Sequence, residues 1–569
     1  MQRRTTLPGL LTAGLLSVAL LVPATPAAAA GDTLVVDASQ SIRPVTHVGA
    51  GGLYAVATAS DPAPGLLTPL RLKQHTQPTP GVQQLGNGAT TPTGDVLKTA
   101  AQYVPDGAQS YARMPDVYPD FPYRWVSWAD WLQKVDTMVK ARADAQQVTN
   151  VNGWELWNEP DWTWDTAKAG PFNDAWTRTF RQVKTQDTIT PIVGPSYSVY
   201  APDLMRAFLT QAKRDGTLPD VVSWHELEDG RYNDVDEHVA HYRALERELG
   251  ISPRPISINE YASPSQVDVP SVAVHYISQF ERLGINDAER AYWYESGTVG
   301  GLVWNNQPTG SYWLYKWYGE MAGNMLAVTP SGDLDGFASY DSTRKVVNVA
   351  FGGVFGDNAV TVKGLAPLGS QVTATLKYTP SAGRKTAVAA PTTISTTTVP
   401  VVDGQITVPV RDQDHLGAYQ LVVTPASGPT SSWQQTYEAE NATVVNARRL
   451  SSGSASNGGY VGRIDGQGDA RAHSFVDFVV EVPAAGTYQM AIRYANGGSG
   501  TATQGLAANG SAFSTVSYPT TGGWGNPSGT VTTPVQLKAG FNTIRLAKGS
   551  PNFAGGTGFA ELDSIRLTR

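Results

Sequence analysis

The sequence predicts a multidomain protein with a (β/α)8 TIM barrel, an accessory β-sandwich and a C-terminal β-sandwich. Between residues 45 and 325, short apolar strands alternate with amphipathic helical stretches, a pattern typical of repeated βα units. Roughly eight such units fit this span, the number that a closed barrel needs. From residue 326 onward the helical period gives way to short β-rich runs separated by Gly, Pro and Asp, which indicates sandwiches.

The barrel elements follow from the local pattern of apolar residues. The expected strands are 46–54, 70–74, 109–114, 153–157, 191–194, 221–225, 255–259 and 290–295. The expected helices include 125–142, 173–185, 202–215, 236–249 and 270–283. A chain of 569 residues exceeds what one hydrophobic core supports, so several domains are expected.

Composition shifts along the chain mark the domain boundaries. Arg3-Arg4, an apolar stretch from Leu7 to Val22 and small residues at 26–30 are typical of a signal peptide, so secretion is expected. The predicted division of the chain is 1–30 signal peptide, 31–44 strand pairing with the accessory β-sandwich, 45–325 barrel, 326–425 accessory β-sandwich, 426–433 linker and 434–569 C-terminal β-sandwich.

Composition also excludes several classes of function. The chain has no cysteine, which rules out disulfides, thiolate metal sites and a cysteine nucleophile. Its net charge of -7 offers no basic surface for nucleic acid or anionic lipid. After the leader, no apolar run reaches the ~20 residues of a spanning helix. We therefore expect neither nucleic-acid nor membrane partners.

The most informative stretch is Trp154-Glu155-Leu156-Trp157-Asn158-Glu159-Pro160-Asp161. An apolar strand that closes on Asn-Glu-Pro stops at the proline, because proline cannot donate to the ladder. Glu159 would then project from the strand end into a loop-lined cleft, where barrel enzymes keep their chemistry. A carboxylic acid in this place suits cleavage of a glycosidic bond.

Hydrolysis with retention needs a second carboxyl group about 5 Å from the first. The run Ile256-Ser257-Ile258-Asn259-Glu260-Tyr261 supplies Glu260 at the exit of another apolar strand. By the barrel count, Glu159 and Glu260 stand at the ends of the fourth and seventh strands. Glu295 is a third strand-end carboxylate, either a rival nucleophile or an acceptor for a substrate hydroxyl.

Residues 31–425 resemble the clan A glycoside hydrolases, and specifically family 39, which joins a (β/α)8 barrel to a β-sandwich. The resemblance rests on Asn158-Glu159-Pro160 and Glu260-Tyr261, with support from 113–119 and 223–225. It implies that Glu159 is the general acid/base, that Glu260 is the nucleophile and that the anomeric configuration is retained. It also implies that Asn158 binds the sugar hydroxyl next to the anomeric carbon.

Neighbouring residues complete the expected site. The reaction needs Glu159 protonated while Glu260 is ionised, so their environments must separate the two pKa values. His225, at a strand exit, either orients a carboxylate, contacts substrate or is a hydrogen-bonded core histidine. Trp162 and Trp164 directly follow the Asn-Glu-Pro motif and are expected to form subsite walls. No His/Asp spacing indicates a catalytic metal, so no cofactor is expected for catalysis.

The C-terminal region carries a candidate calcium site. If its first and last strands are neighbours, Glu438 and Glu440 would meet Asp563, and calcium prefers such carboxylate oxygens. A Glu-x-Glu sequence by itself is more commonly a solvated strand face.

Residues 434–569 resemble carbohydrate-binding modules of families 35 and 6, which are jelly-roll β-sandwiches with a structural calcium. The resemblance implies Glu438, Glu440 and Asp563 as calcium ligands and Tyr460, Trp524 and Asn552 as sugar contacts. Trp524 is flanked by glycines, which favours stacking on a pyranose, whereas Asn552 is equally compatible with a turn.

The leading hypothesis is a secreted retaining glycoside hydrolase acting on plant polysaccharide. The family resemblance favours exo action, with release of arabinose, xylose or a short unit that contains them. Asn259 and Ala262 depart from the Thr and Asn that many family members have there, and this bears on the sugar recognised. The alternatives are an endo-acting clan A glycanase, such as a xylanase or galactanase, and a non-catalytic carbohydrate-binding protein.

Overall fold

The computed structural model describes residues 31–81, 93–102, 107–426, 433–465, 474–482, 484–550 and 552–569. The predicted signal peptide at 1–30 and most of the predicted linker at 426–433 therefore lie outside the described residues. Within the described ranges, no helix combines the length and the apolar character that crossing a bilayer requires.

Eight parallel strands close into a barrel and run around the ring in chain order. They are β2 Gly51–Leu53, β3 Gln74–Pro78, β4 Gln109–Arg113, β5 Val151–Glu155, β6 Ile192–Tyr197, β7 Val221–Glu226, β8 Ile256–Tyr261 and β9 Asp287–Arg290. The first strand pairs in parallel with both β3 and β9, and this double pairing closes the ring. The predicted TIM barrel is confirmed.

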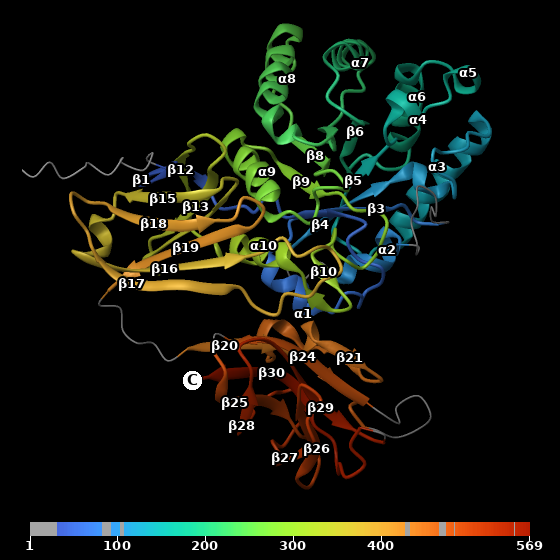
Figure 1. Cartoon of the computed structure of the whole chain (residues 1–569). Coiled ribbons are helices and arrows are strands. Elements are labelled where there is room, and N and C mark those ends of the chain that lie inside the picture. The colour runs from blue at the N-terminus through green and yellow to red at the C-terminus, as the bar shows by residue number, and fades with distance from the viewer. Residues whose placement is uncertain are drawn as a thin grey trace, which may run out of the picture.

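Helices cover the outside of the barrel between successive strands (Figure 1). They are α1 Pro64–Leu67, α2 Val96–Thr99, α3 Trp128–Asp144, α4 Pro160–Thr163, α5 Thr166–Ala169, α6 Phe172–Lys184, α7 Pro202–Asp215, α8 Val235–Leu249, α9 Pro270–Leu283 and α10 Gly310–Glu320. The bounds of α7 and α9 agree with the prediction. Each has proline in its first turn and ends on a left-handed glycine, Gly216 or Gly284.

Two barrel strands differ from their predicted positions. The last one is Asp287–Arg290 rather than 290–295, and the second is Gln74–Pro78 rather than 70–74. Both carry buried polar side chains, including Asp287 and Glu289 in one and His75 in the other. These interior polar residues interrupt the apolar pattern from which a buried strand is predicted. The correction leaves Glu295 in the loop after β9.

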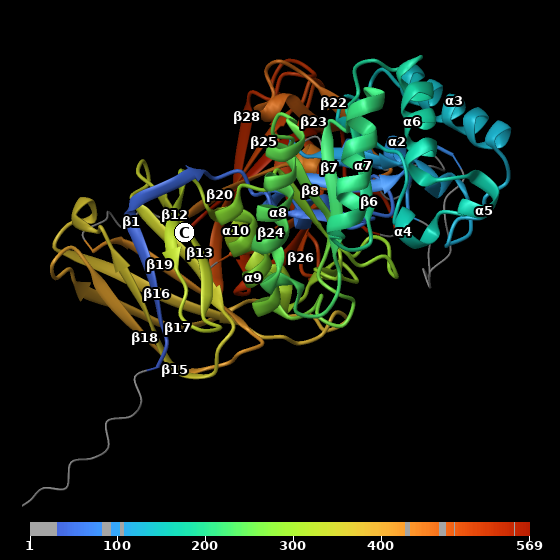
Figure 2. The same ribbon diagram turned by 90° about the horizontal axis from the view of Figure 1, so that it is seen from above.

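The accessory β-sandwich is built from one nine-stranded sheet around its own apolar core. Its strands are β1 Thr33–Pro44, β12 Asn324–Thr329, β13 Asp335–Asp341, β14 Val346–Gly352, β15 Gly356–Lys363, β16 Gln371–Thr379, β17 Thr392–Pro400, β18 Ile406–Gln413 and β19 Ala418–Pro425. The first of these pairs with both β12 and β15 (Figure 2). The chain before the barrel thus contributes to the sheet formed after it. A separate hairpin, β10 Val303–Trp304 with β11 Gln307–Pro308, lies in the loop after β9.

The C-terminal domain packs two antiparallel sheets around a separate core. Its strands are β20 Gln434–Glu438, β21 Thr443–Val445, β22 Arg448–Ser451, β23 Gly459–Gly462, β24 Ser474–Val482, β25 Gly486–Ala495, β26 Ala502–Ala508, β27 Ser514–Tyr518, β28 Gly529–Leu537, β29 Gly540–Lys548 and β30 Glu561–Thr568. The first and last strands pair, with Glu438 opposite Ser564. Alternating burial along β24 shows one face in the core and one outside.

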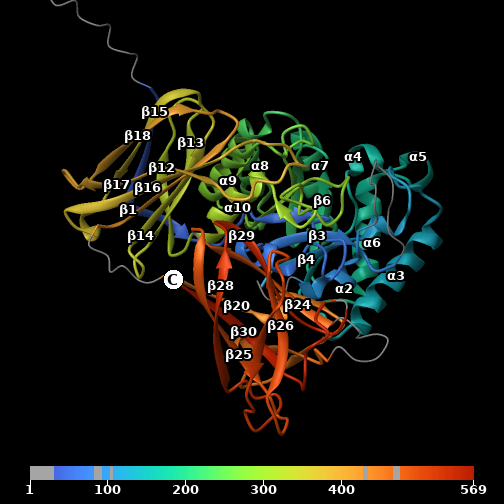
Figure 3. The same cartoon turned by 60° about the horizontal axis from the view of Figure 1, so that its bottom comes forward.

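This domain lies against the barrel (Figure 3), and the contact between them is partly apolar and partly charged. Phe541 packs on the rings of Tyr312 and Trp313 in α10, with ring centroids 5.5 and 5.2 Å apart. Lys316 Nζ lies 2.6 Å from Glu481 Oε2. A cavity of about 1090 Å³ at this junction is lined by Val45 and Lys73, among others. Those two residues precede β2 and β3, so the junction lies toward the strand starts.

Candidate active site

Glu159 lies just beyond β5, where the chain turns into α4. Its φ of 52° and ψ of 50° are left-handed, a conformation that costs a non-glycine residue about 1–2 kcal/mol. The Glu159 amide donates to the Ser196 carbonyl at 2.8 Å, and Pro160 follows in the first helical turn. The neighbouring strand and the proline therefore hold the turn that presents this carboxyl group.

Glu260 belongs to β8, the seventh strand of the ring, whereas Glu159 follows β5, the fourth. The β7–β8 register places His225 opposite Glu260. All three residues are buried, and Glu159 and Glu260 are 7% and 3% exposed. The barrel thus brings the two glutamates of the Asn-Glu-Pro and Glu-Tyr motifs to one site.

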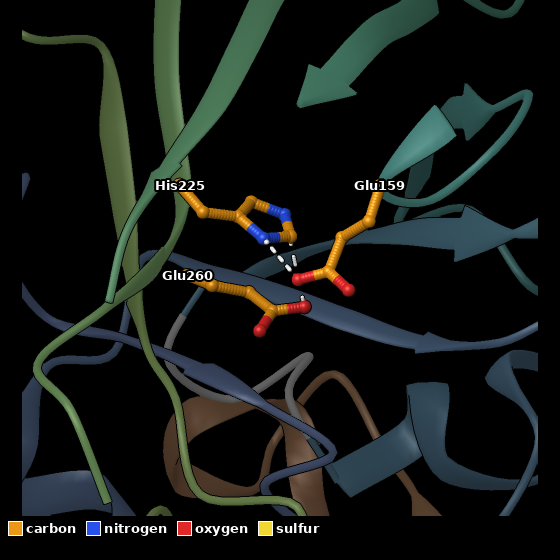
Figure 4. A group of neighbouring side chains, drawn as sticks. All are labelled: Glu159, His225 and Glu260. Atoms are coloured by element: carbon orange, nitrogen blue, oxygen red, sulfur yellow. Dashed lines mark hydrogen bonds and ion pairs between the residues drawn. The ribbon is translucent and has the colours of Figure 1, made fainter. Parts of the chain in front are cut away.

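His225 lies beside both carboxyl groups and contacts each of them (Figure 4). Its Nδ1 is 3.1 Å from Glu159 Oε1, and its Nε2 is 3.7 Å from Glu260 Oε1. One oxygen of each carboxyl group and one ring nitrogen lie within 4.8 Å of one another. Retaining glycosidases space their carboxyl groups about 5–5.5 Å apart, and inverting enzymes about 6.5–9.5 Å. The separation therefore favours retention, and His225 has the position of a residue that orients carboxylates.

The pKa values of this group are set by burial and by the imidazole. Burial raises the pKa of Glu260, and the nearby charges of His225 and Arg113 offset this only in part. Burial is also the largest single influence on Glu159, but the hydrogen bond and charge of His225 together with the charge of Arg113 outweigh it and lower the pKa. Burial lowers the pKa of His225, and the two carboxylates more than reverse that effect. Without substrate, the proton is therefore favoured on His225 and not on Glu159. The pKa of Glu159 is lowered and that of Glu260 is raised, whereas the reaction needs Glu159 protonated and Glu260 ionised.

Arg113 is a site residue to which the sequence alone assigned no role. Its Nη1 lies 2.6 Å from Glu260 Oε1, while its Nε lies 2.7 Å from Glu155 Oε2. Asn259 Nδ2 donates to Glu155 Oε1 at 2.6 Å. Arg113 is 1% exposed, so these charge-assisted hydrogen bonds are shielded from water. They hold the Glu260 carboxyl group in place. A buried arginine at a strand end was the available sequence signal.

A further buried carboxyl group, Asp116, lies close to Arg113 in the same part of the barrel. It accepts hydrogen bonds from the Tyr54 hydroxyl at 2.6 Å and from the Tyr123 hydroxyl at 3.0 Å. Burial raises the pKa of Asp116 to about 7, with Arg113 acting in the opposite direction. The Tyr54 ring lies 5.7 Å from the Arg113 guanidinium carbon, which connects this cluster to the Glu260 network.

Asn158 precedes the Asn-Glu-Pro glutamate and is 3% exposed. Its side-chain oxygen is buried and has no hydrogen-bond partner among the described residues. A buried acceptor without a partner costs about 1–3 kcal/mol, so a ligand hydroxyl would be a favourable partner. This fits the predicted role of Asn158 in binding a sugar hydroxyl.

The two tryptophans after the motif have different environments. Trp162 is 53% exposed and packs edge-on against Phe121, with ring centroids 5.4 Å apart. Trp164 is 8% exposed, packs on Trp157 and donates to the Gly170 carbonyl at 2.8 Å. The prediction that Trp164 forms a subsite wall is wrong, because its ring is used in the barrel core. Trp162 remains available to substrate.

Glu295 stands apart from the glutamate pair. It forms an ion pair with Lys385 of the accessory β-sandwich, and the Tyr292 hydroxyl donates to it at 3.4 Å. The close group of titratable side chains consists of Glu159, His225 and Glu260 without it. The geometry therefore favours Glu260 over Glu295 as the nucleophile.

Of the three predicted sugar contacts in the C-terminal domain, Trp524 and Tyr460 lie at the same loop, whereas Asn552 lies elsewhere. The indole of Trp524 covers Gly497 so closely that a Cβ there would lie 2.6 Å from the ring, and Trp524 is still 47% exposed. A Cβ on Gly525 would lie 3.3 Å from the Tyr460 hydroxyl, so Tyr460 is adjacent to this loop. Asn552 instead accepts a hydrogen bond from Arg545 at 3.0 Å on the other sheet. It therefore has a structural partner of its own.

Two of the three predicted calcium ligands, Glu438 and Asp563, meet at Ser456, and the third, Glu440, contacts the next residue, Asn457. The Ser456 hydroxyl oxygen lies 2.6 Å from Glu438 Oε2 and 2.7 Å from Asp563 Oδ2. Glu440 accepts from Asn457 at 3.2 Å, and its other oxygen is buried without a partner among the described residues. Burial, and after it the neighbouring carboxylates, raise the pKa values of Glu438 and Glu440. This donor set suits calcium, although Arg493 already lies 2.9 Å from Asp563 Oδ2.

Comparison with known proteins assigns both parts of the chain. A family model described as carbohydrate binding module (family 35) matches residues 435–569. The solved structure of N2152 from Neocallimastix frontalis is 31% identical, with a TM-score of 0.65, and the match covers 70% of this chain and 100% of that one.

Two curated relatives come from bifidobacteria. A 3-O-alpha-D-galactosyl-alpha-L-arabinofuranosidase of Bifidobacterium longum subsp. longum is 28% identical over 68% of this chain and 34% of its own length. A 3-O-beta-L-arabinopyranosyl-alpha-L-arabinofuranosidase of Bifidobacterium pseudocatenulatum is 25% identical over 79% and 54%. The chain thus spans about a third to a half of the length of these relatives. The match to N2152 shows that the barrel and its accessory β-sandwich belong to the same family as that protein, and residues 435–569 form a family 35 carbohydrate-binding module.

Proposed function

We propose that the protein is a retaining glycoside hydrolase that removes arabinose- or xylose-containing units from plant polysaccharide. The observation that carries the proposal is the approach of Glu159 and Glu260 within 4.8 Å from the carboxyl ends of two barrel strands. The buried, unpartnered oxygen of Asn158 beside the pair supports it. The names of the two bifidobacterial relatives favour an α-L-arabinofuranosidase over a β-xylosidase.

In the proposed reaction, a Glu260 carboxylate oxygen attacks the anomeric carbon while Glu159 donates its proton to the departing glycosidic oxygen. The product of this step is a glycosyl ester of Glu260. Water then attacks the same carbon, Glu159 accepts the water proton, and the Glu260 carboxylate is released. Two inversions at one carbon give retention.

His225 supplies a route by which Glu159 acquires its proton. A protonated imidazole beside an ionised Glu159 has the same proton count as a neutral imidazole beside a protonated Glu159. Transfer along the contact of 3.1 Å from Nδ1 to Oε1 interconverts the two without proton uptake. The neutral ring then keeps its proton on Nε2, which faces Glu260 at 3.7 Å and favours the ionised nucleophile.

The names of the two curated relatives support exo action. Each names an arabinofuranose that carries one further sugar on O3, and release of such a short unit is the reaction we propose. Trp162, exposed next to the acid/base residue, is proposed to contact the leaving part of the substrate.

The C-terminal module is proposed to bind polysaccharide through Trp524 and Tyr460. Glu438, Glu440 and Asp563 would hold a structural calcium, whose charge would offset the repulsion among these carboxylates. The extracellular location of plant polysaccharide and the apolar leader at 7–22 support secretion.

Product analysis tests the proposed function. The protein is incubated with arabinogalactan, arabinan and xylan, and with p-nitrophenyl pentosides and hexosides, and the products are identified by chromatography and NMR. We expect one small pentose-containing product of retained configuration from the non-reducing end. A ladder of oligosaccharides would overturn exo action, and inversion at the anomeric carbon would overturn the mechanism.

A further inference from the structure

The connection between β16 and β17, residues 380–391, leaves the accessory β-sandwich and packs on the barrel. Arg384 Nη1 donates to the Pro264 carbonyl at 2.9 Å, and the Ser381 hydroxyl donates to the Asp268 carbonyl at 3.1 Å. Pro264 and Asp268 belong to the loop after β8, the strand of Glu260. This segment of the sandwich therefore supports a loop at the catalytic end of the barrel.

The same connection contacts the loop after β9. Lys385 forms an ion pair with Glu295, and its ammonium lies 4.7 Å from the ring centroid of Trp304. Arg384 lies 4.8 Å from the ring centroid of Tyr292. Glu295 is 14% exposed and Lys385 55%, so this pair is reachable from solvent.

The loop that carries Glu295 also contacts the residues around the nucleophile. Trp293 packs with Tyr54 in one apolar cluster, and the Tyr54 ring lies 5.7 Å from Arg113. Arg113 in turn bonds Glu260 at 2.6 Å. Glu295 follows Trp293 by two residues, so the loop after β9 carries both the Glu295–Lys385 pair and a ring that packs beside the Arg113–Glu260 network.

We propose that Glu295, Lys385 and Trp304 form a rim subsite that binds the sugar unit attached to the one being cleaved. A carboxylate accepts hydrogen bonds from sugar hydroxyls, an ammonium donates to hydroxyl and ring oxygens, and an indole packs on the apolar face of a sugar. The ligand class is a neutral, hydroxyl-rich pentose or hexose unit. The inference rests on the proposed function, and in it Lys385 contacts the sugar directly.

The carbohydrate-binding module helps to hold this rim in place. Trp313 Nε1 donates to the Val388 carbonyl at 2.8 Å, and the Trp313 ring packs on Phe541 of the module at 5.2 Å. A Cβ on Gly540 would lie 2.5 Å from the Ala389 carbonyl oxygen, so module and connection are in direct contact. The rim subsite thus depends on three parts of the fold.

Kinetics with two substrates test the subsite. For Lys385→Ala we expect KM for an arabino-oligosaccharide to rise about tenfold with kcat within twofold, because one charged hydrogen bond is lost. KM for the one-sugar substrate p-nitrophenyl α-L-arabinofuranoside should not change. Lys385→Arg should retain most of the oligosaccharide affinity, and Lys363→Ala, an exposed lysine on β15, should have no effect.

An unchanged oligosaccharide KM in Lys385→Ala, or an equal change for both substrates, would overturn the subsite. If the wild type cleaves no pentoside, the proposed function fails separately. Calorimetric titration of arabino-oligosaccharide into Glu260→Ala, with and without Lys385→Ala, then decides the subsite: a tenfold loss of affinity supports it and equal affinity overturns it.

Phe541→Ala tests the contribution of the module. We expect faster hydrogen exchange in 380–391 and 291–297, with a smaller rise in oligosaccharide KM, about threefold, in the same direction as Lys385→Ala. Phe559→Ala is the matched control, because Phe559 is an exposed phenylalanine of the same module. Unchanged exchange in 380–391 would refute the support by the module.

Discussion

The catalytic glutamates and the carboxylates of the module are two acidic clusters with different ways of balancing charge. In the barrel, Arg113 bonds Glu260, and His225 reaches both glutamates. In the module, Glu438 and Glu440 have neutral hydrogen-bond partners, Ser456 and Asn457, whereas Asp563 forms an ion pair with Arg493. The first cluster is neutralised by the protein itself, whereas the second leaves charge that a metal ion would offset.

This difference teaches what each cluster is suited to do. Fixed cationic neighbours can hold one carboxylate ionised while another exchanges a proton, which acid–base chemistry requires. Carboxylates without such neighbours repel one another, and binding a cation is the direct way to relieve that repulsion. The predictions that follow test the clusters in turn.

The largest effect is expected for the nucleophile. Glu260→Ala should lower kcat by about 10⁴-fold or more, because the covalent step is lost. Added azide should restore turnover and give a glycosyl azide of inverted configuration, detected by NMR. Glu248→Ala, at an exposed ion pair with Arg206, serves as the control and should retain kcat. Wild-type rates in Glu260→Ala would transfer the nucleophile role to Glu295.

The next effect concerns the cation of the barrel cluster. Arg113→Met should lower the free energy of unfolding by about 3–5 kcal/mol, because Glu155 and Glu260 would remain buried without their partner. Urea denaturation followed by tryptophan fluorescence measures the change. Arg344→Met, at an exposed ion pair with Asp341, is the comparison and should change stability by less than about 1 kcal/mol. Equal stability of the two variants would contradict the importance of the buried cation.

The next prediction concerns Asp116, a buried carboxyl group that accepts hydrogen bonds from the hydroxyls of Tyr54 and Tyr123. Its pKa is raised from 3.8 to about 7, so the folded state holds the proton more tightly than the unfolded state. The resulting stability is fully present below about pH 4 and is lost as the pH rises through 7. The wild type should lose stability between pH 4 and 7 more steeply than Asp116→Asn, measured by denaturation at several pH values. Parallel pH profiles would show that burial does not shift this group.

The smallest effect is expected at the module. Removal of calcium by EDTA should lower the Tm of the module by a few degrees, because a ligand that binds only the folded state stabilises it. Scanning calorimetry measures the shift, and cleavage of p-nitrophenyl glycosides should be unaffected. Glu440→Gln should abolish the calcium-dependent shift, and magnesium should replace calcium poorly. The same Tm in EDTA and in calcium would contradict the proposed site.

The barrel shows where prediction from sequence succeeds. Helices α7 and α9 were placed correctly because proline at the start and glycine at the end are local signals. Glu159 and Glu260 were identified because each follows an apolar strand, and parallel strands bring their carboxyl ends to one edge. Strand β9 was misplaced because Asp287 and Glu289 face the interior and interrupt the apolar pattern.

Trp162 and Trp164 show where the same reasoning reaches its limit. They are two residues apart and chemically identical, but one is exposed and the other packs in the core. Their roles depend on which way the short helix α4 turns after Glu159, and no local pattern specifies that.

The sequence by itself determined the order of the domains, the barrel and the pair of glutamates, because these depend on periodicity and on residues adjacent in the chain. The tertiary structure decided that Arg113 bonds Glu260, that His225 contacts both carboxyl groups, and that Lys385 meets Glu295. The physical reason is that each of these contacts joins separate strands or domains, so its geometry exists only once the barrel has closed and the sandwich has docked.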